Sequence, residues 1–218
     1  LLRNLEIERT EGLSGSGSCT ARQPTSATRT VSTQWLPARR LPKRMSEPLR
    51  ITTYEYHGEP GVSCAPTGAS QNLLCRKTVQ PTTDADGAQT FLAVSDGPPR
   101  DWTYTYNAAG QVLTVNGPRT DVGDVTTYSY YASDDPAGAF RAGDLASITN
   151  ALGHVIVFAQ YDGAGRLRKS IDPNGLETLL DYWPRGWLKS RQAGAAAAGY
   201  ETTTFDYDDN GSLTRVTM

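Results

Sequence analysis

The sequence predicts an all-β fold built from tandem antiparallel β-hairpins. Two observations lead to this prediction: one short pattern recurs along the chain, and the composition favours strands over helices. The 218 residues include 11 Tyr and 4 Trp but only 4 Phe and 2 Met. Tyr and Trp combine an apolar ring with a polar group, which suits the half-buried face of a sheet.

The recurring pattern is a strand that ends in Tyr, three further residues, Gly, any residue, and then Leu or Val. Four copies match it well: Tyr106 with Gly110, Tyr161 with Gly165, Tyr182 with Gly186, and Tyr207 with Gly211. Side chains alternate along a strand, so Tyr-x-Tyr places successive aromatic rings on one face. The Asn, Asp and Gly residues that follow favour a reversal, because Gly readily takes the left-handed conformation of a tight hairpin loop.

Three less regular copies fill the gaps, and each starts from an aromatic residue: Trp35, Tyr56 and Tyr130. The copies at Tyr56 and Tyr130 contain insertions, after which the chain returns at Leu74 and Leu145. In the first copy Arg39 takes the place of Gly. With the four regular copies, the sequence therefore predicts seven hairpins and about fourteen strands.

We expect these hairpins to form one continuous repeat domain over residues 28–218. A single hairpin is marginally stable in water, whereas neighbouring hairpins satisfy one another's open strand edges. A sheet of about fourteen strands tends to curl or close, so we expect a curled sheet or part of a hollow β-shell. Residues 1–27 are expected to hold a partial repeat and a flexible Gly/Ser-rich loop, in a fragment of a longer protein.

One detail departs from simple alternation. The second apolar residue of three returning strands falls five or six positions after the glycine, at Val115, Ile171 and Val216. This spacing indicates either a β-bulge or an early end of the strand.

Cys64 and Cys75 flank a loop-like excursion, and two interpretations remain open for them. A disulfide between them would stabilise the fold by about 3 kcal/mol in the chain-entropy picture and would favour an oxidising compartment. A reduced pair is the alternative. Cys19 is left without a partner.

Composition and motifs argue against several functions. The net charge of −2 offers no basic surplus for nucleic acid, and no run of about 18 apolar residues could span a membrane. Asp206, Asp208 and Asn210 match the first half of a calcium loop, but Thr217 stands where a Glu is required. His57 and His154 lack metal-ligand spacing. We predict no catalytic residue, no metal and no cofactor, and hence no enzyme.

The best-matched copy is Tyr161-Asp162-Gly-Ala-Gly165-Arg166-Leu167, followed by Asp172-Pro173-Asn174-Gly175. Together with Tyr207-Asp208 and its following Gly211, it resembles the YD repeats of the Rhs family. The resemblance extends over about residues 28–218. Asn107, Tyr131 and Trp183 depart from the family's Asp after the key aromatic residue.

The resemblance implies a function that composition does not reveal. Members of this family wind such hairpins into a hollow shell, and in bacteria that shell typically encloses a variable C-terminal toxin domain. The expected partners are therefore the rest of the parent polypeptide and its toxin cargo, in a protein secreted or held at the bacterial cell surface.

Two alternatives remain. The aromatic residues could bind cell-surface glycans in an adhesion or carbohydrate-binding module. Asp172-Pro-Asn-Gly-Leu176 also resembles the box at which such shells cut themselves, although a linker between repeats is the favoured interpretation.

Overall fold

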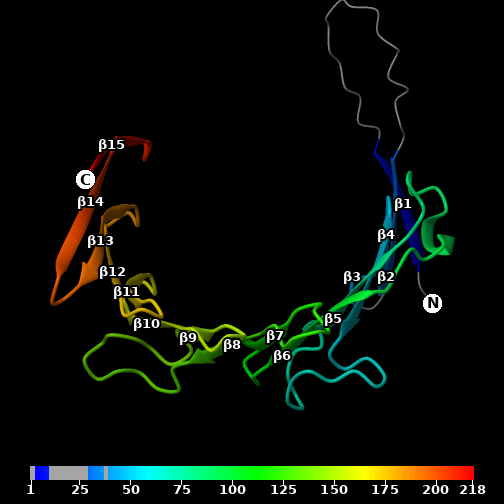
Figure 1. The fold of residues 1–218 in the computed structure, drawn as a ribbon, viewed down its shortest axis with the longest axis horizontal. Coiled ribbons are helices and arrows are strands. Elements are labelled where there is room, and N and C mark those ends of the chain that lie inside the picture. The colour runs from blue at the N-terminus through cyan, green and yellow to red at the C-terminus, as the bar shows by residue number, and fades with distance from the viewer. Residues whose placement is uncertain (1–2, 10–28, 37–38) are drawn as a thin grey trace, which may run out of the picture. The chain divides into compact units, whose positions relative to one another are not determined.

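The structure is a computed structural model that describes residues 3–9, 29–36 and 39–218. These residues form fifteen β-strands and a single three-residue 3-10 helix (Figure 1). The predicted all-β class is confirmed. The proposed Gly/Ser-rich loop and Cys19 lie outside the described residues. The described helix is far too short to cross a membrane.

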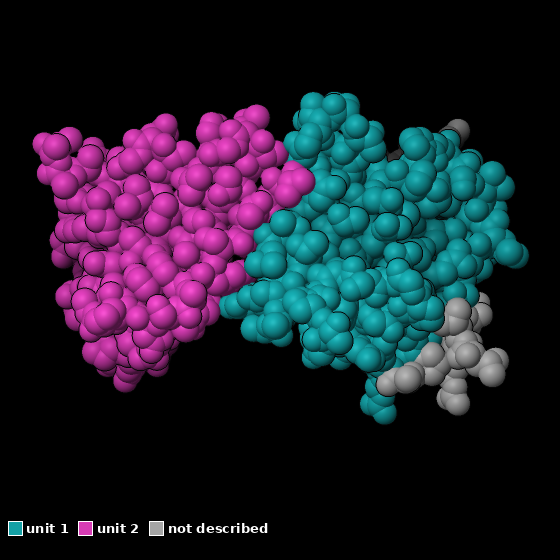
Figure 2. All heavy atoms as spheres, turned by 90° about the horizontal axis from the view of Figure 1, so that it is seen from below, with its two compact units in different colours: residues 1–124 teal, residues 125–218 magenta. Residues whose placement is uncertain are grey.

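The chain divides into two compact units, residues 1–124 and 125–218 (Figure 2). The first contains β1 (Arg3–Arg9), β2 (Arg29–Leu36), β3 (Leu41–Glu47), β4 (Arg50–Tyr56), β5 (Leu74–Pro81), η1 (Thr90–Leu92), β6 (Arg100–Tyr106) and β7 (Val112–Asn116). The second contains β8 (Val125–Tyr130), β9 (Leu145–Thr149), β10 (Val155–Tyr161), β11 (Leu167–Ile171), β12 (Glu177–Tyr182), β13 (Leu188–Ala195), β14 (Gly199–Tyr207) and β15 (Leu213–Thr217).

Within each unit every strand pairs with the next one along the chain, always antiparallel. The predicted tandem arrangement of hairpins is therefore confirmed. Seven hairpins start with the strands that carry the predicted aromatic residues at or next to their last position: β2–β3, β4–β5, β6–β7, β8–β9, β10–β11, β12–β13 and β14–β15.

Each of these hairpins has a register shift next to its terminal aromatic residue. Tyr106, for example, lies opposite Val112, whereas Thr105 lies opposite Thr114, so Leu113 is an extra residue in the returning strand. The corresponding extra residues are Lys43, Cys75, Leu113, Ala146, Arg168, Lys189 and Thr214.

This bulge explains the irregular spacing of the apolar residues. Val115 lies opposite Tyr104, two residues before Tyr106, which lies opposite Val112. Val216 similarly lies opposite Phe205. The extra residue shifts the alternation of the returning strand by one, so its apolar residues stay opposite the aromatic ones.

The sheets have little fully buried apolar core. Among the described residues, the buried hydrophobic side chains are Ile51, Tyr56 and Cys75, all in the first unit. In β8 half-buried and exposed residues alternate: Tyr128 and Tyr130 are half-buried and Ser129 is exposed. The strands β7, β9, β11 and β12 are half-buried at every position. Strand pairing and contacts between hairpins therefore contribute a larger share of the stability than they do in a protein with a large buried core.

Residues between β5 and β6 add a small covering element to the first unit. The helix η1 contacts β2 and β3, and the guanidinium of Arg44 lies over the Phe91 ring, 4.8 Å from its centre. Asp84 is 2% exposed, and its carboxylate accepts hydrogen bonds from the backbone N–H groups of Gly87 and Gln89. These bonds hold the segment in place.

Candidate functional site: the joints between repeats

The turn after Tyr161 has a geometry that recurs through the chain. The N–H of Asp162 donates to the carbonyl of Arg166 at 2.9 Å, and the N–H of Gly165 donates to the carbonyl of Asp162 at 2.9 Å. Gly165 has φ +77°, which side chains with a Cβ rarely adopt. The Asp162 carboxylate also accepts from the N–H groups of Ala164 and Arg166.

The contacts of Asp162 also bear on its acidity. Burial acts to raise the pKa of this carboxyl group, but its hydrogen bonds from the Arg166 backbone and guanidinium and from Ala164 lower the pKa overall. The Asp of the repeat therefore favours the charged form and holds the loop closed.

The same two backbone bonds close three other turns of the pattern: residues 107–111, 183–187 and 208–212. Their glycines, Gly110, Gly186 and Gly211, have φ of +81°, +93° and +88°. The side-chain oxygens of Asn107 and Asp208 accept a hydrogen bond from the last N–H of the loop, as that of Asp162 does. The side chain of Trp183 contains no oxygen and cannot accept this bond. Because the Asp208 carboxylate is engaged with Asn210 and Ser212 of its own loop, it acts as a turn residue.

The opposite ends of two hairpins use this turn as well, which the sequence pattern did not indicate. Asn150 and Asp172 each begin a five-residue loop closed by the same backbone bonds, with Gly153 and Gly175 at positive φ. The Asp172 side chain accepts from the N–H groups of Asn174 and Leu176 at 2.8 Å. Asp172-Pro-Asn-Gly thus forms a capped turn between β11 and β12.

The two long insertions lie inside this turn. The N–H of His57 donates to the carbonyl of Leu73, and the N–H of Tyr131 donates to the carbonyl of Asp144, both at 2.9 Å. In the short turn the equivalent bond runs from the N–H of Asp162 to the carbonyl of Arg166. Each insertion therefore leaves the hairpin closed as before.

The turn after Trp35 differs from the expectation in one respect. We expected Arg39 at the glycine position, but the left-handed residue is Arg40, with φ +54°. Trp35 lies opposite Pro42, seven residues later, whereas Tyr161 lies opposite Leu167, six residues later. The separation between the aromatic residue and its partner is thus one residue longer, which moves the left-handed position by one.

Four terminal tyrosines join their hairpin to the one before it. Each hydroxyl donates to the backbone carbonyl of the residue that lies opposite the terminal aromatic residue of the preceding hairpin. We call this contact a tyrosine joint. The four pairs are Tyr56 to Pro42 at 2.8 Å, Tyr106 to Leu74 at 2.8 Å, Tyr161 to Leu145 at 2.6 Å and Tyr182 to Leu167 at 2.9 Å.

The acceptor in each joint lies just before a bulge. Leu145 precedes Ala146, for example, and lies opposite Tyr130, the terminal tyrosine of its own hairpin. A bulge disrupts the ladder of strand hydrogen bonds, so a carbonyl beside it needs another donor. The next hairpin's tyrosine supplies that donor.

Burial shifts the ionisation of these hydroxyl groups. It raises the pKa of Tyr56 and of Tyr161 to about 12, with smaller contributions from nearby acidic groups. It also raises the pKa values of Tyr106 and Tyr182. The neutral, donating form is therefore favoured at all four joints.

The last hairpin is joined through an aromatic contact. The rings of Trp187 and Tyr207 lie 5.3 Å apart, between the turn of the sixth hairpin and the terminal tyrosine of the seventh. Aromatic pairs at this distance stabilise a fold by about 0.5–1.5 kcal/mol beyond the area they bury.

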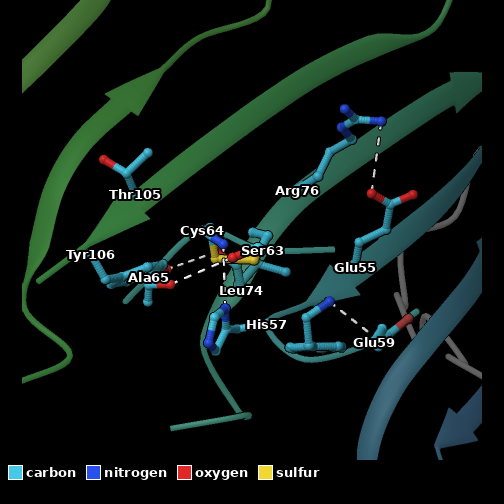
Figure 3. The surroundings of a disulfide bond; sticks show 12 residues. Glu55, His57, Glu59, Ser63, Cys64, Ala65, Leu74, Arg76, Thr105 and Tyr106 are labelled. Carbon is cyan, nitrogen blue, oxygen red and sulfur yellow. Dashed lines mark hydrogen bonds and ion pairs between the residues drawn. A yellow bond between two sulfur atoms is a disulfide. The ribbon is translucent and has the colours of Figure 1, made fainter. Parts of the chain in front are cut away.

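The insertion after Tyr56 contains a second notable group. Cys64 and Cys75 form a disulfide with their Cα atoms 5.4 Å apart, and Cys75 is the extra residue of the β5 bulge. The ring of His57 points toward Cys64, whose N–H donates to His57 Nδ1 at 3.3 Å (Figure 3). The Cys64 carbonyl accepts from the N–H of Tyr106 at 2.8 Å. The excursion thus reaches the joint of the next hairpin.

Several acidic side chains outside the turns are paired with basic ones. Asp181 contacts Arg168 at 2.9 Å and Lys189 at 3.2 Å, and Glu177 contacts Lys169 at 2.7 Å. His154 is exposed and belongs to the turn of Asn150. These groups serve the sheet and its turns.

Residues 141–177 match the model of the RHS repeat family. The chain contains an RHS repeat. The matched segment includes β9, β10 and β11, and so holds the joint from Tyr161 to Leu145 and three of the five-residue turns, residues 150–154, 162–166 and 172–176. The matched segment thus holds one complete hairpin, β10–β11, and one tyrosine joint.

Solved structures with the same fold are also known. The chain resembles the crystal structure of TcdB2-TccC3-Cdc42 with a TM-score of 0.61 and 16% identity, over 89% of this chain and 9% of that one. It resembles TcdB2-TccC3 without the hypervariable C-terminal region with a TM-score of 0.58 and 15% identity, over 88% and 9%. The chain therefore spans only 9% of the length of either. No curated protein matches it.

Proposed function

We propose that this chain is a structural shell segment of an Rhs-type protein, which encloses and helps to deliver a C-terminal toxin domain that lies outside this chain. The observation that carries the proposal is the tyrosine joint, repeated between successive hairpins. Each joint involves only two neighbouring hairpins. A wall built this way can be extended by adding repeats, as in other repeat proteins.

The comparisons support the enclosing role. The chain contains an RHS repeat, and its fold is shared with TcdB2-TccC3, one form of which is described as lacking a hypervariable C-terminal region. A variable C-terminal region attached to a constant wall is the arrangement that a delivery shell needs. The cargo, its release and its target belong to the parent protein.

The chemistry of the chain supports a non-enzymatic role outside the cytosol. The acidic side chains considered above act as turn caps or ion-pair partners, which are structural tasks. The disulfide between Cys64 and Cys75 is typical of secreted or cell-surface proteins.

The proposal is tested by limited proteolysis of the parent protein. We expect its C-terminal domain to resist protease while the repeat region is folded. Combined Tyr161→Phe and Tyr182→Phe substitutions, which remove two joints, should expose it. Equal rates of cleavage of the C-terminal domain inside the parent and on its own would contradict the proposal, as would a parent reading frame without such a domain.

A second candidate is binding of cell-surface glycans, and the side chain of Trp183 favours it. Trp183 is 38% exposed, and the Lys189 ammonium lies 5.2 Å from the centre of its ring. An exposed ring beside a cation is a common contact surface for sugars. Saturable binding to a glycan array that Trp183→Ala abolishes would favour this candidate, whereas a shell segment should give no saturable binding.

A further inference from the structure

The side chains of His57, Cys64 and Cys75 make none of the hydroxyl hydrogen bonds of the tyrosine joints. The possible ligand atoms of these three residues all lie within 4.8 Å of one another. His57 is 8% exposed and Cys75 7%. Two sulfur atoms and one imidazole nitrogen, gathered in a mostly buried place, are the ligand types that Zn²⁺ prefers in proteins.

The backbone around His57 is fixed from both sides. Its N–H donates to Leu73, and its carbonyl accepts from Arg39 Nη1 at 3.0 Å. Because Nδ1 accepts the long bond from the Cys64 N–H, its lone pair points toward the cysteine segment. At His57 Nδ1, a metal ion would take the place of the Cys64 N–H as the group that the lone pair contacts.

We propose that this group is a disulfide-masked Zn²⁺ site, closed by the S–S bond under oxidising conditions and able to bind the metal once reduced. Two equivalents of a thiol reductant break the S–S bond, give each cysteine sulfur a hydrogen and are themselves oxidised to one disulfide. Zn²⁺ then binds both sulfurs as thiolates, and two protons pass to solvent. His57 supplies the third ligand, and solvent completes the tetrahedron.

The geometry requires only small movements. Tetrahedral Zn²⁺ with sulfur and nitrogen ligands separates those atoms by roughly 3.5–3.8 Å. The ligand atoms now lie within 4.8 Å of one another, so the imidazole nitrogen needs to move by only about 1 Å, and reduction lets the two bonded sulfur atoms separate to the required distance. The cysteine Cα atoms are 5.4 Å apart. In its reduced form the excursion between Tyr56 and Leu74 would thus stay closed by a metal in place of the disulfide.

The test titrates Co²⁺, a spectroscopic substitute for Zn²⁺, into the full chain with Cys19→Ser, so that no other thiol contributes. After reduction with a phosphine, we expect one equivalent to bind with a thiolate-to-cobalt charge-transfer band, and Zn²⁺ to displace it. The oxidised chain should show neither. His57→Ala should weaken binding roughly tenfold or more, whereas His154→Ala, at an exposed turn, should leave it unchanged.

A fourth variant keeps the test decisive if His57→Ala folds poorly. His57→Cys restores a ligand, so the reduced variant should bind Co²⁺ with a stronger thiolate band, while circular dichroism reports on the β-structure. Absence of the band in the reduced chain would overturn the proposal. So would equal binding by the oxidised and reduced chains, or binding unaffected in well-folded His57→Ala.

Discussion

Tyrosine has two roles at the residue scale. Its ring lies on the half-buried face of a strand, and its hydroxyl donates to a carbonyl beside the bulge of the preceding hairpin. Phe would fill the same space but leave that carbonyl without a donor. A carbonyl deprived of its partner costs about 1–3 kcal/mol when buried.

Adjacent tyrosines of β6 allow this role to be measured. Tyr106 makes a joint to Leu74, whereas the Tyr104 hydroxyl has no hydrogen-bond partner among the described residues. We expect Tyr106→Phe to lower the free energy of unfolding by about 1–2 kcal/mol. Tyr104→Phe, the matched control, should change it by less than about 0.5 kcal/mol. Urea unfolding compares the two, and equal effects would contradict the assignment of the joint.

The turn after Tyr161 contains its own control. Gly165 has φ +77° and open space where a methyl group would stand, so Gly165→Ala should cost about 1–2 kcal/mol through the backbone alone. Gly163, two residues earlier, has the same open space without a left-handed φ. Gly163→Ala should therefore be neutral or slightly stabilising. Thermal unfolding of both variants tests this, and a larger loss in Gly163→Ala would refute it.

The joints predict a pH dependence on the alkaline side. Burial raises the pKa of Tyr56 and Tyr161 from 10.0 to about 12. The unfolded chain loses these protons first, so this contribution to stability is complete below pH 10 and declines as the pH rises from 10 toward 12. Tyrosinate absorbance should show two groups that titrate near pH 12, and Tyr56→Phe and Tyr161→Phe should remove them one at a time. Titration of all tyrosines near 10 would contradict this.

The sequence indicated some of these residues and not others. Strand alternation and turn chemistry are local, and so the terminal aromatics and glycines could be named in advance. The acceptor of a joint could not, because it depends on the register between two hairpins. Arg40 was missed because Trp35 and its partner Pro42 are one residue further apart than the repeat predicts.

At the scale of elements, the hairpin tolerates insertions because its closing bonds come from the residues at the ends of the loop. His57 and Leu73 close one insertion, as Tyr131 and Asp144 close the other. The bulge is the second constant feature. The sequence hinted at it through Val115, Ile171 and Val216 but could not separate it from an early strand end.

The disulfide predicts a local effect on stability. Its removal by Cys64→Ala with Cys75→Ala should lower the free energy of unfolding of the first unit by about 3 kcal/mol. Hydrogen exchange should quicken in β5 and β6, because the Cys64 carbonyl accepts from the Tyr106 N–H. Amides of β12 and β13 serve as the internal control, and faster exchange there would contradict a local effect. The metal-binding cluster around this bond was invisible in sequence, since only the pairing of Tyr56 with Leu74 brings His57 near it.

At the scale of the whole molecule, each unit is a meander whose strands contact mainly their sequence neighbours. Few side chains are fully buried, so stability comes from pairing repeated along the chain. The fold class followed from sequence because the repeat is local. That the seven copies form one continuous repeat domain over residues 28–218, curled into a shell, stays a prediction.

Nuclear Overhauser effects between strands of neighbouring hairpins test the central claim most directly. The claim is that, within each unit, a hairpin pairs with the preceding one and that the tyrosine joints hold such neighbours together. We expect backbone contacts between Lys169 and Leu179, which link β11 to β12, and ring contacts from Tyr182 to Leu167. Contacts within hairpins but none between β11 and β12 would contradict the account.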